Sequence, residues 1–194
     1  MQILFMGIFA AVAVVLDQVT KYLTVTNMRW FVDSKSSITI DAIEKFLAAY
    51  GLTPAQSAAM PYEKAAIPGL FNFTHTLNDG AAWSMFEGQQ WLFALIFVGF
   101  TVAVILEFKK NFLGFSTFEH WCLAAVYAGG LGNMIDRLRF GFVVDMIDLD
   151  FGWFKSFPIF NVADCFITCG CIALIFHLVF FNKAFWKDGK KKGN

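Results

Sequence analysis

Long apolar runs alternate with polar connections along this chain, and four of the runs are long enough to cross a lipid bilayer. A helix that spans the hydrocarbon core, about 30 Å thick, needs about 20 largely apolar residues. The runs therefore predict membrane-spanning helices over about residues 3–25, 90–108, 117–138 and 160–181. No basic residue precedes the first run and no clear small-x-small cleavage site follows it, which favours a span over a cleaved signal peptide.

The connection between the first and second runs is long and has a pattern of its own. In IDAIEKFLAAYG, apolar residues recur at helical spacing, and Thr53 and Pro54 further on suit an N-cap and a first helical turn. This pattern predicts a small surface helical hairpin over about residues 39–60, inside an outer segment of about 33–65. The residues from Leu70 to Leu77 alternate in a way that indicates strands lying against the membrane.

Composition assigns the chain to a broad class. Hydrophobic residues make up 58% of it and charged residues 15%, against roughly a quarter charged in a soluble domain. We expect an α-helical membrane protein of one domain, residues 1–194, with four transmembrane helices. A small β-containing cradle and the extra helical segment of the first outer loop are expected on the periplasmic or extracellular side. The net charge of zero gives no indication of nucleic-acid binding.

The cysteines do not indicate a metal site. All four lie in apolar segments, and they lack the spacing and the histidine partners of a zinc site. We interpret them as small buried hydrophobes: Cys122, Cys165, Cys169 and Cys171.

Basic residues set the expected orientation, because cytoplasmic loops are enriched in lysine and arginine. The short second connection contains Lys109 and Lys110, and five lysines follow the fourth run: Lys183, Lys187, Lys190, Lys191 and Lys192. Both segments are expected in the cytoplasm, together with both chain termini. The two longer connections, about residues 26–89 and 139–159, then face outward.

On this topology the polar residues in and beside the spans fall into one layer at the outer membrane boundary. The layer comprises Asp17, Lys21, Asn78, Asp79, Asn133, Asp136, Arg137, Asp145, Asp148, Asp150, Asn161 and Asp164. Charges near a span end cost much less than charges at its centre, so any one of these residues could be a structural anchor. Asp17 and Lys21, for example, are four residues apart and could form an ion pair.

Two asparagine–aspartate pairs indicate more than anchoring. Asn133 and Asp136 are three residues apart, as are Asn161 and Asp164, so each pair lies on one helix face. Glycines in the GGLG stretch (129–132) would let the helices approach closely beneath the loop that bears Asp145. Two neighbouring carboxyl groups in a low-dielectric site share a proton, because both cannot ionise there. Such a pair can deprotonate a water for attack on a peptide carbonyl and protonate the leaving amine.

Other functions are compatible with some of the same residues. The carboxylates could form a proton relay in a small transporter, although only Glu107 and His177 would continue it towards the inner side. Alternatively, Asp145, Asp148 and Asp150 could bind magnesium in a membrane transferase, which a chelator would inhibit. A purely structural four-span partner protein is a third alternative. The carboxyl pair with its flanking asparagines favours a hydrolytic enzyme.

Four stretches of the chain resemble the lipoprotein signal peptidase family, the bacterial signal peptidase II. They are LDQVTKYL (16–23), FNFTHTLNDGAAWSMF (71–86), GGLGNMIDRLRFGFVVDMID (129–148) and FPIFNVADCFI (157–167). They occur in family order on the expected spans and cover most of the chain outside the 33–65 region. The resemblance implies an aspartic endopeptidase of the bacterial inner membrane. It would cleave prolipoproteins on the N-terminal side of a diacylglyceryl-modified cysteine and release the signal peptide.

The resemblance also implies roles for individual residues. Asp145 in VVD and Asp164 in NVAD would be the catalytic pair, and the supporting positions are Asn78, Gly80, Asn133, Asp136, Arg137, Asn161, Asp17 and Lys21. Asn133, Arg137 and Asn161 are expected to position the substrate and the carboxyl groups, and Asp17, Lys21 and Asp136 to hold the scaffold. The implied partners are lipidated prolipoproteins and membrane lipids. No metal or organic cofactor is implied, and we expect a monomer.

Two features depart from the family pattern. Trp83 stands where the family usually has phenylalanine, and the 33–65 segment is longer than expected. We hypothesise that the hairpin in this segment shields the substrate entrance or contacts a partner.

Overall fold

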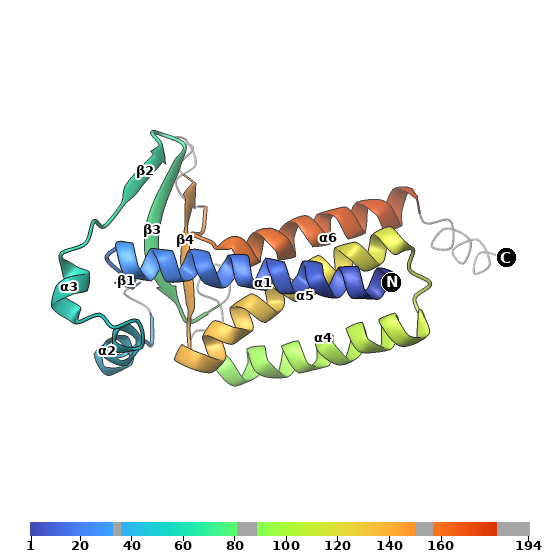
Figure 1. Cartoon of the computed structure of the whole chain (residues 1–194), viewed down its shortest axis with the longest axis horizontal. Helices are drawn as coiled ribbons and strands as arrows, with labels where there is room; N and C mark the ends of the chain where they lie inside the picture. The colour runs from blue at the N-terminus through green and yellow to red at the C-terminus, as the bar shows by residue number, and fades with distance from the viewer. Residues whose placement is uncertain (33–35, 81–88, 150–156, 182–194) are drawn as a thin grey trace.

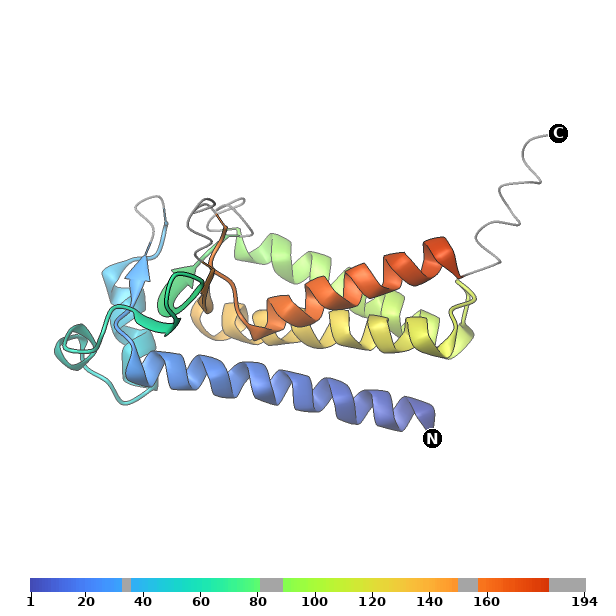
Figure 2. The same ribbon diagram turned by 90° about the horizontal axis from the view of Figure 1, so that it is seen from above.

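The long apolar runs form the helices of the molecule. The computed structural model describes residues 1–32, 36–80, 89–149 and 157–181. The long helices in it are α1 (Gln2–Asn27), α4 (Gln90–Lys110), α5 (Thr117–Phe140) and α6 (Val162–Phe180), all close to the predicted bounds. Figure 1 and Figure 2 show them side by side along the long axis of the molecule, with the sheet and two short helices at one end.

Helix α5 differs from the other three long helices. Among the residues that the structure describes, α1, α4 and α6 are long and apolar enough to cross a membrane, and α5 is not among them. Helix α5 contacts each of the other three, and it buries Glu119, Asn133 and Asp136. A helix surrounded by other helices can carry more polar groups than one that faces lipid, because its polar groups find protein partners.

Glycines allow α5 to approach its neighbours closely. A Cβ added at Gly129 would collide with the carbonyl oxygen of Ala163 in α6. A Cβ at Gly132 would lie 2.6 Å from a carboxylate oxygen of Asp17 in α1, closer than a real side chain can come. These two positions therefore fix how near α5 lies to both helices. The prediction that the GGLG stretch permits close packing is confirmed.

A four-stranded sheet crosses the end of the helices. Its strands are β1 (Phe31–Val32), β2 (Lys64–Ile67), β3 (Phe71–Asn78) and β4 (Val143–Leu149). Strand β4 pairs with β3 in antiparallel fashion along most of its length. The opposite edge of β3 is therefore shared by β1, which is parallel to it, and β2, which is antiparallel to it.

The two faces of this sheet have different surroundings. Helix α2 (Ile40–Ala49), which is followed by α3 (Pro54–Ala58), covers one face. Its Phe46 packs in one buried cluster with residues of β3 and β4 that include Val144 and Met146. Because side chains alternate along a strand, Asp145 points to the other face. Helices therefore occupy the segment for which a hairpin was predicted, and α2 covers the face of the sheet away from Asp145.

Candidate active site

Asp145 lies in the middle of β4 and is 3% exposed. One of its carboxylate oxygens accepts a hydrogen bond from Asn78 Nδ2 at 2.9 Å, across the ladder from β3. The other accepts from Asn161 Nδ2 at 2.6 Å. Two amide groups from different elements therefore hold this carboxyl group in one orientation.

Asp164 lies in the first turn of α6, and Asn161 is the N-cap of that helix. The Asn161 side chain accepts from the Asp164 backbone N–H at 3.0 Å, and the Asp164 side chain accepts from the Asn161 N–H at 3.1 Å. This reciprocal arrangement is a capping box, which satisfies backbone donors at the start of a helix. A polar pair at the entrance of an apolar helix thus has a local structural cause. Asp164 is half-buried, and its second oxygen accepts from Asn133 Nδ2 at 2.7 Å.

Asn161 and Asn133 join the two carboxyl groups into one network. Asn161 contacts Asp145 through its side chain and Asp164 through its backbone. Its Nδ2 also lies 2.9 Å from Asn133 Oδ1, and Asn133 in turn donates to Asp164. Asn133 of α5 therefore meets the capping pair at the start of α6, as the sequence predicted, although Asn161 is the N-cap of α6 and not part of a helix face. Asp145 of β4 contacts the same pair through Asn161.

The environment of Asp145 changes its titration. Burial raises the pKa of Asp145 to about 7, and the nearby charge of Asp164 adds to the increase. The hydrogen bond from Asn78 acts in the opposite direction on this pKa. Near neutral pH, Asp145 is therefore divided between its protonated and ionised forms, so it can donate or accept a proton there.

Asp17, Lys21 and Asp136 form a buried ion cluster beneath this pair. Lys21 is 1% exposed, and its Nζ lies 2.9 Å from both Asp17 and Asp136. Lys21 also donates to Asn133 Oδ1 at 3.0 Å. Asp17 accepts from the Ala163 N–H at 2.9 Å, and Asp136 accepts from the Val144 N–H at 3.2 Å. The cluster therefore fixes both the start of α6 and the residue before Asp145.

Arg137 and Gly80 lie on the far side of Asn78. Gly80 N–H donates to Asn78 Oδ1 at 3.0 Å, and Arg137 donates to the Gly80 carbonyl oxygen at 2.8 Å. The Arg137 guanidinium also lies 4.3 Å from the ring centroid of Phe93. Its Nε is buried without a hydrogen-bond partner in the described part of the chain. Arg137 thus supports the segment that carries Asn78 and retains one unused donor.

Gln18 and Thr76 lie at the site although neither was predicted from the sequence. Gln18 Nε2 lies 3.0 Å from Asp136 and 3.2 Å from Asp17, so it belongs to the ion cluster. Its signal was a polar residue beside Asp17 within an apolar run. Thr76 pairs directly with Asp145, and its hydroxyl is buried without a partner among the described residues. Strand register alone brings Thr76 to this position.

The metal-site hypothesis involved Asp145, Asp148 and Asp150, of which the structure describes the first two. Within the described part of the chain, no three histidine, cysteine, aspartate or glutamate side chains are grouped so that they could hold a metal ion. Asp150 lies outside the described residues, and so does Trp83.

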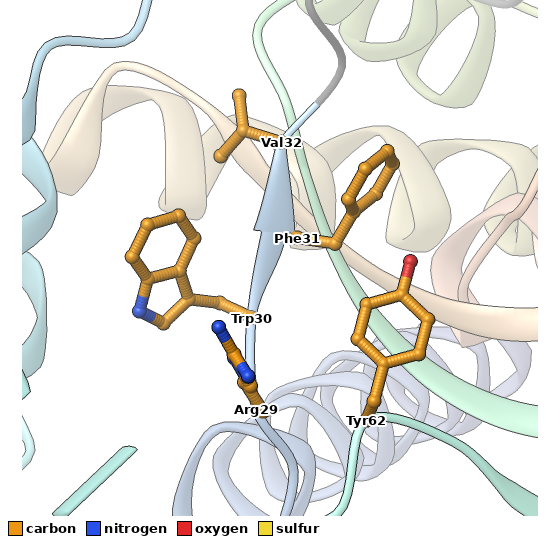
Figure 3. Close-up of a pocket in the computed structure, with 5 residues that line it drawn as sticks. All are labelled: Arg29, Trp30, Phe31, Val32 and Tyr62. Atoms are coloured by element: carbon orange, nitrogen blue, oxygen red, sulfur yellow. The ribbon is translucent and has the colours of Figure 1, made fainter. Parts of the chain in front are cut away.

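A cavity of about 420 Å³ lies beside β1, at some distance from the carboxyl pair. Figure 3 shows the residues that line it: Arg29, Trp30, Phe31, Val32 and Tyr62. Phe31 pairs with Thr76, which pairs with Asp145 on the other edge of β3. The cavity is therefore two strands away from Asp145, and we do not regard it as the reaction site.

Relatives of this chain occur among known proteins. A family model described as signal peptidase (SPase) II matches residues 9–180. A lipoprotein signal peptidase of Enterococcus faecalis is 38% identical over 165 residues, which cover 85% of this chain and 96% of the relative. One from Streptococcus agalactiae is 42% identical over 134 residues, covering 68% of this chain and 77% of the relative.

Two solved structures share the fold. Both are described as bacterial membrane enzymes. One has a TM-score of 0.67 at 28% identity and covers 93% of this chain and 90% of its own. The other has a TM-score of 0.63 at 29% identity, covering 92% of this chain and 94% of its own.

Proposed function

Because the chain belongs to the signal peptidase II family, we propose that it is an aspartic endopeptidase that removes signal peptides from lipidated prolipoproteins. The observation that carries the proposal is the pair of carboxyl groups joined by Asn161. Asp145 is buried and Asp164 is half-buried, and a single asparagine contacts both. Such a pair has the components of an aspartic peptidase and requires no further group.

Hydrolysis by this pair proceeds through a water held between the carboxyl groups. The ionised carboxyl group takes a proton from the water as its oxygen attacks the scissile carbonyl carbon. The protonated carboxyl group then gives its proton to the leaving nitrogen as the carbon–nitrogen bond breaks. The products are the signal peptide, with a new carboxyl terminus, and the lipoprotein, with a free amine on its modified cysteine. Proton sharing lets one site perform both transfers at neutral pH.

The surrounding residues have supporting roles in this proposal. Asn78, Asn133 and Asn161 orient the carboxyl groups through the hydrogen bonds described above, without adding charge to the site. Asp17, Lys21 and Asp136 hold the helices and β4 in register. Gly80 links Arg137 to Asn78, and the unused Nε of Arg137 can donate to a substrate carbonyl.

The membrane arrangement follows from the same proposal. We assign α5 as a fourth span that is enclosed by α1, α4 and α6, in the bacterial inner membrane. Lysines after α6 and at the end of α4 favour the cytoplasm for that end of the bundle and for both termini. The sheet, α2, α3 and the carboxyl pair then lie at the outer face, and a single chain forms the whole site. Acyl chains in the bilayer would hold the substrate's modified cysteine at that depth.

A proton relay through the membrane has less support. Between Glu119 at one end of α5 and Asn133 near the other, the buried residues of this helix are Cys122, Leu123, Ala124, Ala128, Gly129 and Gly132. This stretch offers no chain of ionisable side chains on α5. A hydrolytic site confined to one end of the bundle agrees better with that distribution.

Cleavage of matched precursors by the purified protein tests the proposal. Wild type should cleave a diacylglyceryl-modified precursor and leave the unmodified precursor intact, with no effect of a chelator. Asp145→Asn and Asp164→Asn should each reduce turnover by at least 10³-fold, roughly, while remaining folded, because each removes one of the two proton-transfer groups. Normal cleavage by either variant would refute the assignment of the pair.

A further inference from the structure

Asp79 is a buried carboxyl group that the proposed reaction does not use. It follows Asn78 directly and is 4% exposed. One of its carboxylate oxygens accepts a hydrogen bond from the Ser36 hydroxyl at 3.0 Å. The other accepts from the Ser37 backbone N–H at 2.8 Å and also from the Ser37 hydroxyl. Hydrogen bonds to an ionised acceptor are roughly twice as strong as neutral ones, so this carboxylate holds residues 36 and 37 against the end of β3.

Ser36 and Ser37 connect Asp79 to the face of the sheet that α2 covers. The Ser36 hydroxyl accepts from the Ile38 N–H at 3.1 Å, and Ile38 packs against the buried cluster that contains Phe46 of α2. The residue after Ile38 is the N-cap of α2. The start of α2 is therefore tied to the end of β3 through the Asp79 carboxylate.

Asn78, the residue before Asp79, holds the reactive carboxyl group. It ends β3 and lies opposite Val143 in the β3–β4 ladder. Its side chain donates to Asp145 at 2.9 Å. Because the strand ends here, the contacts of the residues that follow decide how the Asn78 side chain is presented to Asp145.

Three elements hold the backbone that follows Asn78. The Asp79 carbonyl oxygen accepts from Gln90 Nε2, in the first turn of α4, at 2.6 Å. The Gly80 carbonyl oxygen accepts from Arg137 of α5. The Asp79 carboxylate adds the third contact, which is the one that reaches the outer segment.

From this chain of contacts we infer that Asp79 is a positioning residue, which keeps Asn78 in the orientation required to donate to Asp145. It does so by binding Ser36 and Ser37, and we call these three residues, Ser36, Ser37 and Asp79, the brace. The inference rests on the proposed function, because that function makes Asp145 a reacting group. It gives the outer segment a role in the reaction, since residues 36–49 then support the carboxyl pair from outside the helix bundle.

The hydrogen bond from Asn78 has a consequence that can be measured. It stabilises the ionised form of Asp145 and so lowers the pKa of that group. The charged groups that also act on Asp145 are Asp164 of α6, Lys21 of α1 and Arg137 of α5. All three remain in place when the brace is removed. Loss of the brace should therefore raise the pKa of Asp145 through Asn78 alone, and kcat/KM should begin to fall at a higher pH.

The test compares pH–rate profiles of Asn78→Ala, Asp79→Ala and the double variant with that of wild type. Asn78→Ala should move the alkaline limb of kcat/KM upward by about one pH unit, the effect of one hydrogen bond to a charged group. Asp79→Ala should move the limb in the same direction by the same amount or less. The double variant should show no shift beyond that of Asn78→Ala, because both substitutions remove the same contact to Asp145. Unfolding measured against pH reports the same titration without requiring turnover.

Glu107 provides a matched control. It is 1% exposed and its carboxylate accepts from the Leu113 N–H at 3.0 Å, so it too is a buried carboxyl group that holds a connecting segment. It lies near the end of α4, whereas Asp79 contacts the start of that helix. Glu107→Ala should lower stability, as Asp79→Ala does, but leave the alkaline limb at its wild-type pH. Ser37→Ala removes one side-chain donor of the brace and should give a smaller upward shift, and it replaces Asp79→Ala if that variant fails to fold.

Three results would overturn the inference, and they differ from a failure of the proposed function. An alkaline limb that stays at the wild-type pH in Asp79→Ala and Ser37→Ala would mean that the brace has no influence on Asp145. The same shift in Glu107→Ala would attribute the effect to general loosening of the fold. A double variant that shifts by the sum of the two single shifts would show that Asp79 does not act through Asn78. Absence of cleavage of a lipidated precursor by wild type would refute the proposed function itself.

Discussion

Removing the positive charge of Lys21 should strongly destabilise the protein. Lys21 is 1% exposed and lies 2.9 Å from Asp17 and 2.9 Å from Asp136, which are themselves buried. Lys21→Met keeps most of the side-chain volume but leaves two buried carboxyl groups without their cation. Breaking a buried ion pair by removal of one partner costs about 3–5 kcal/mol of unfolding free energy. We expect a loss within that range.

The chain offers a control with the same local geometry. Lys45 and Asp41 are also four residues apart on a helix, with a separation of 2.7 Å, but their side chains are 76% and 72% exposed. Exposed pairs contribute little because water solvates each charge separately. Lys45→Met should therefore leave the unfolding free energy unchanged within error. The two variants differ chiefly in the burial of the pair.

Chemical unfolding in mild detergent, followed by tryptophan fluorescence, would measure both variants. Adding Asp17→Asn to Lys21→Met should recover part of the loss, since one uncompensated carboxyl group is removed. If Lys21→Met proved as harmless as Lys45→Met, this cluster could not be what holds α1, α5 and β4 together.

Two further predictions concern titration and helix packing. The pKa of Asp145 rises from an ordinary value of 3.8 to about 7 on folding, so its proton favours the folded state below pH 4 and this contribution is lost as the pH rises to 7. In pH-dependent unfolding, wild type should therefore lose stability relative to Asp145→Asn across that range, and a difference in unfolding free energy that does not change with pH would contradict the raised pKa. In a pH–rate profile, kcat/KM of wild type should fall about tenfold per pH unit above 7. Gly129→Ala should separate α5 from α6 and reduce both stability and turnover, because its Cβ would collide with the Ala163 carbonyl oxygen. Gly99→Ala is the control: its Cβ would have no atom within 4 Å, so the substitution should be neutral or slightly stabilising in the same assays.

The sequence by itself determined that this is a helical membrane protein, and it indicated most of the polar residues that meet at one end of the helices. Apolar run length predicts helices because a backbone in lipid must satisfy its own hydrogen bonds, and that requirement does not depend on neighbouring segments. The three-residue spacing of Asn161 and Asp164 predicted a shared helix face; in the structure Asn161 instead precedes α6 as its N-cap, and the same spacing forms a capping box with Asp164. The sequence motifs were also sufficient to indicate the family.

Tertiary structure decided which polar residues belong together. Lys21 lies equally near Asp17, four residues away, and Asp136 on another helix, and no local rule selects the second partner. The position of Asp145 depends on β4, whose register places Thr76 opposite it and α2 behind it. A shift of one residue along β4 would turn Asp145 towards α2, into the buried cluster that contains Phe46, because side chains alternate between faces. Long-range pairing of this kind depends on how the whole sheet packs, and so it cannot be read from either strand alone.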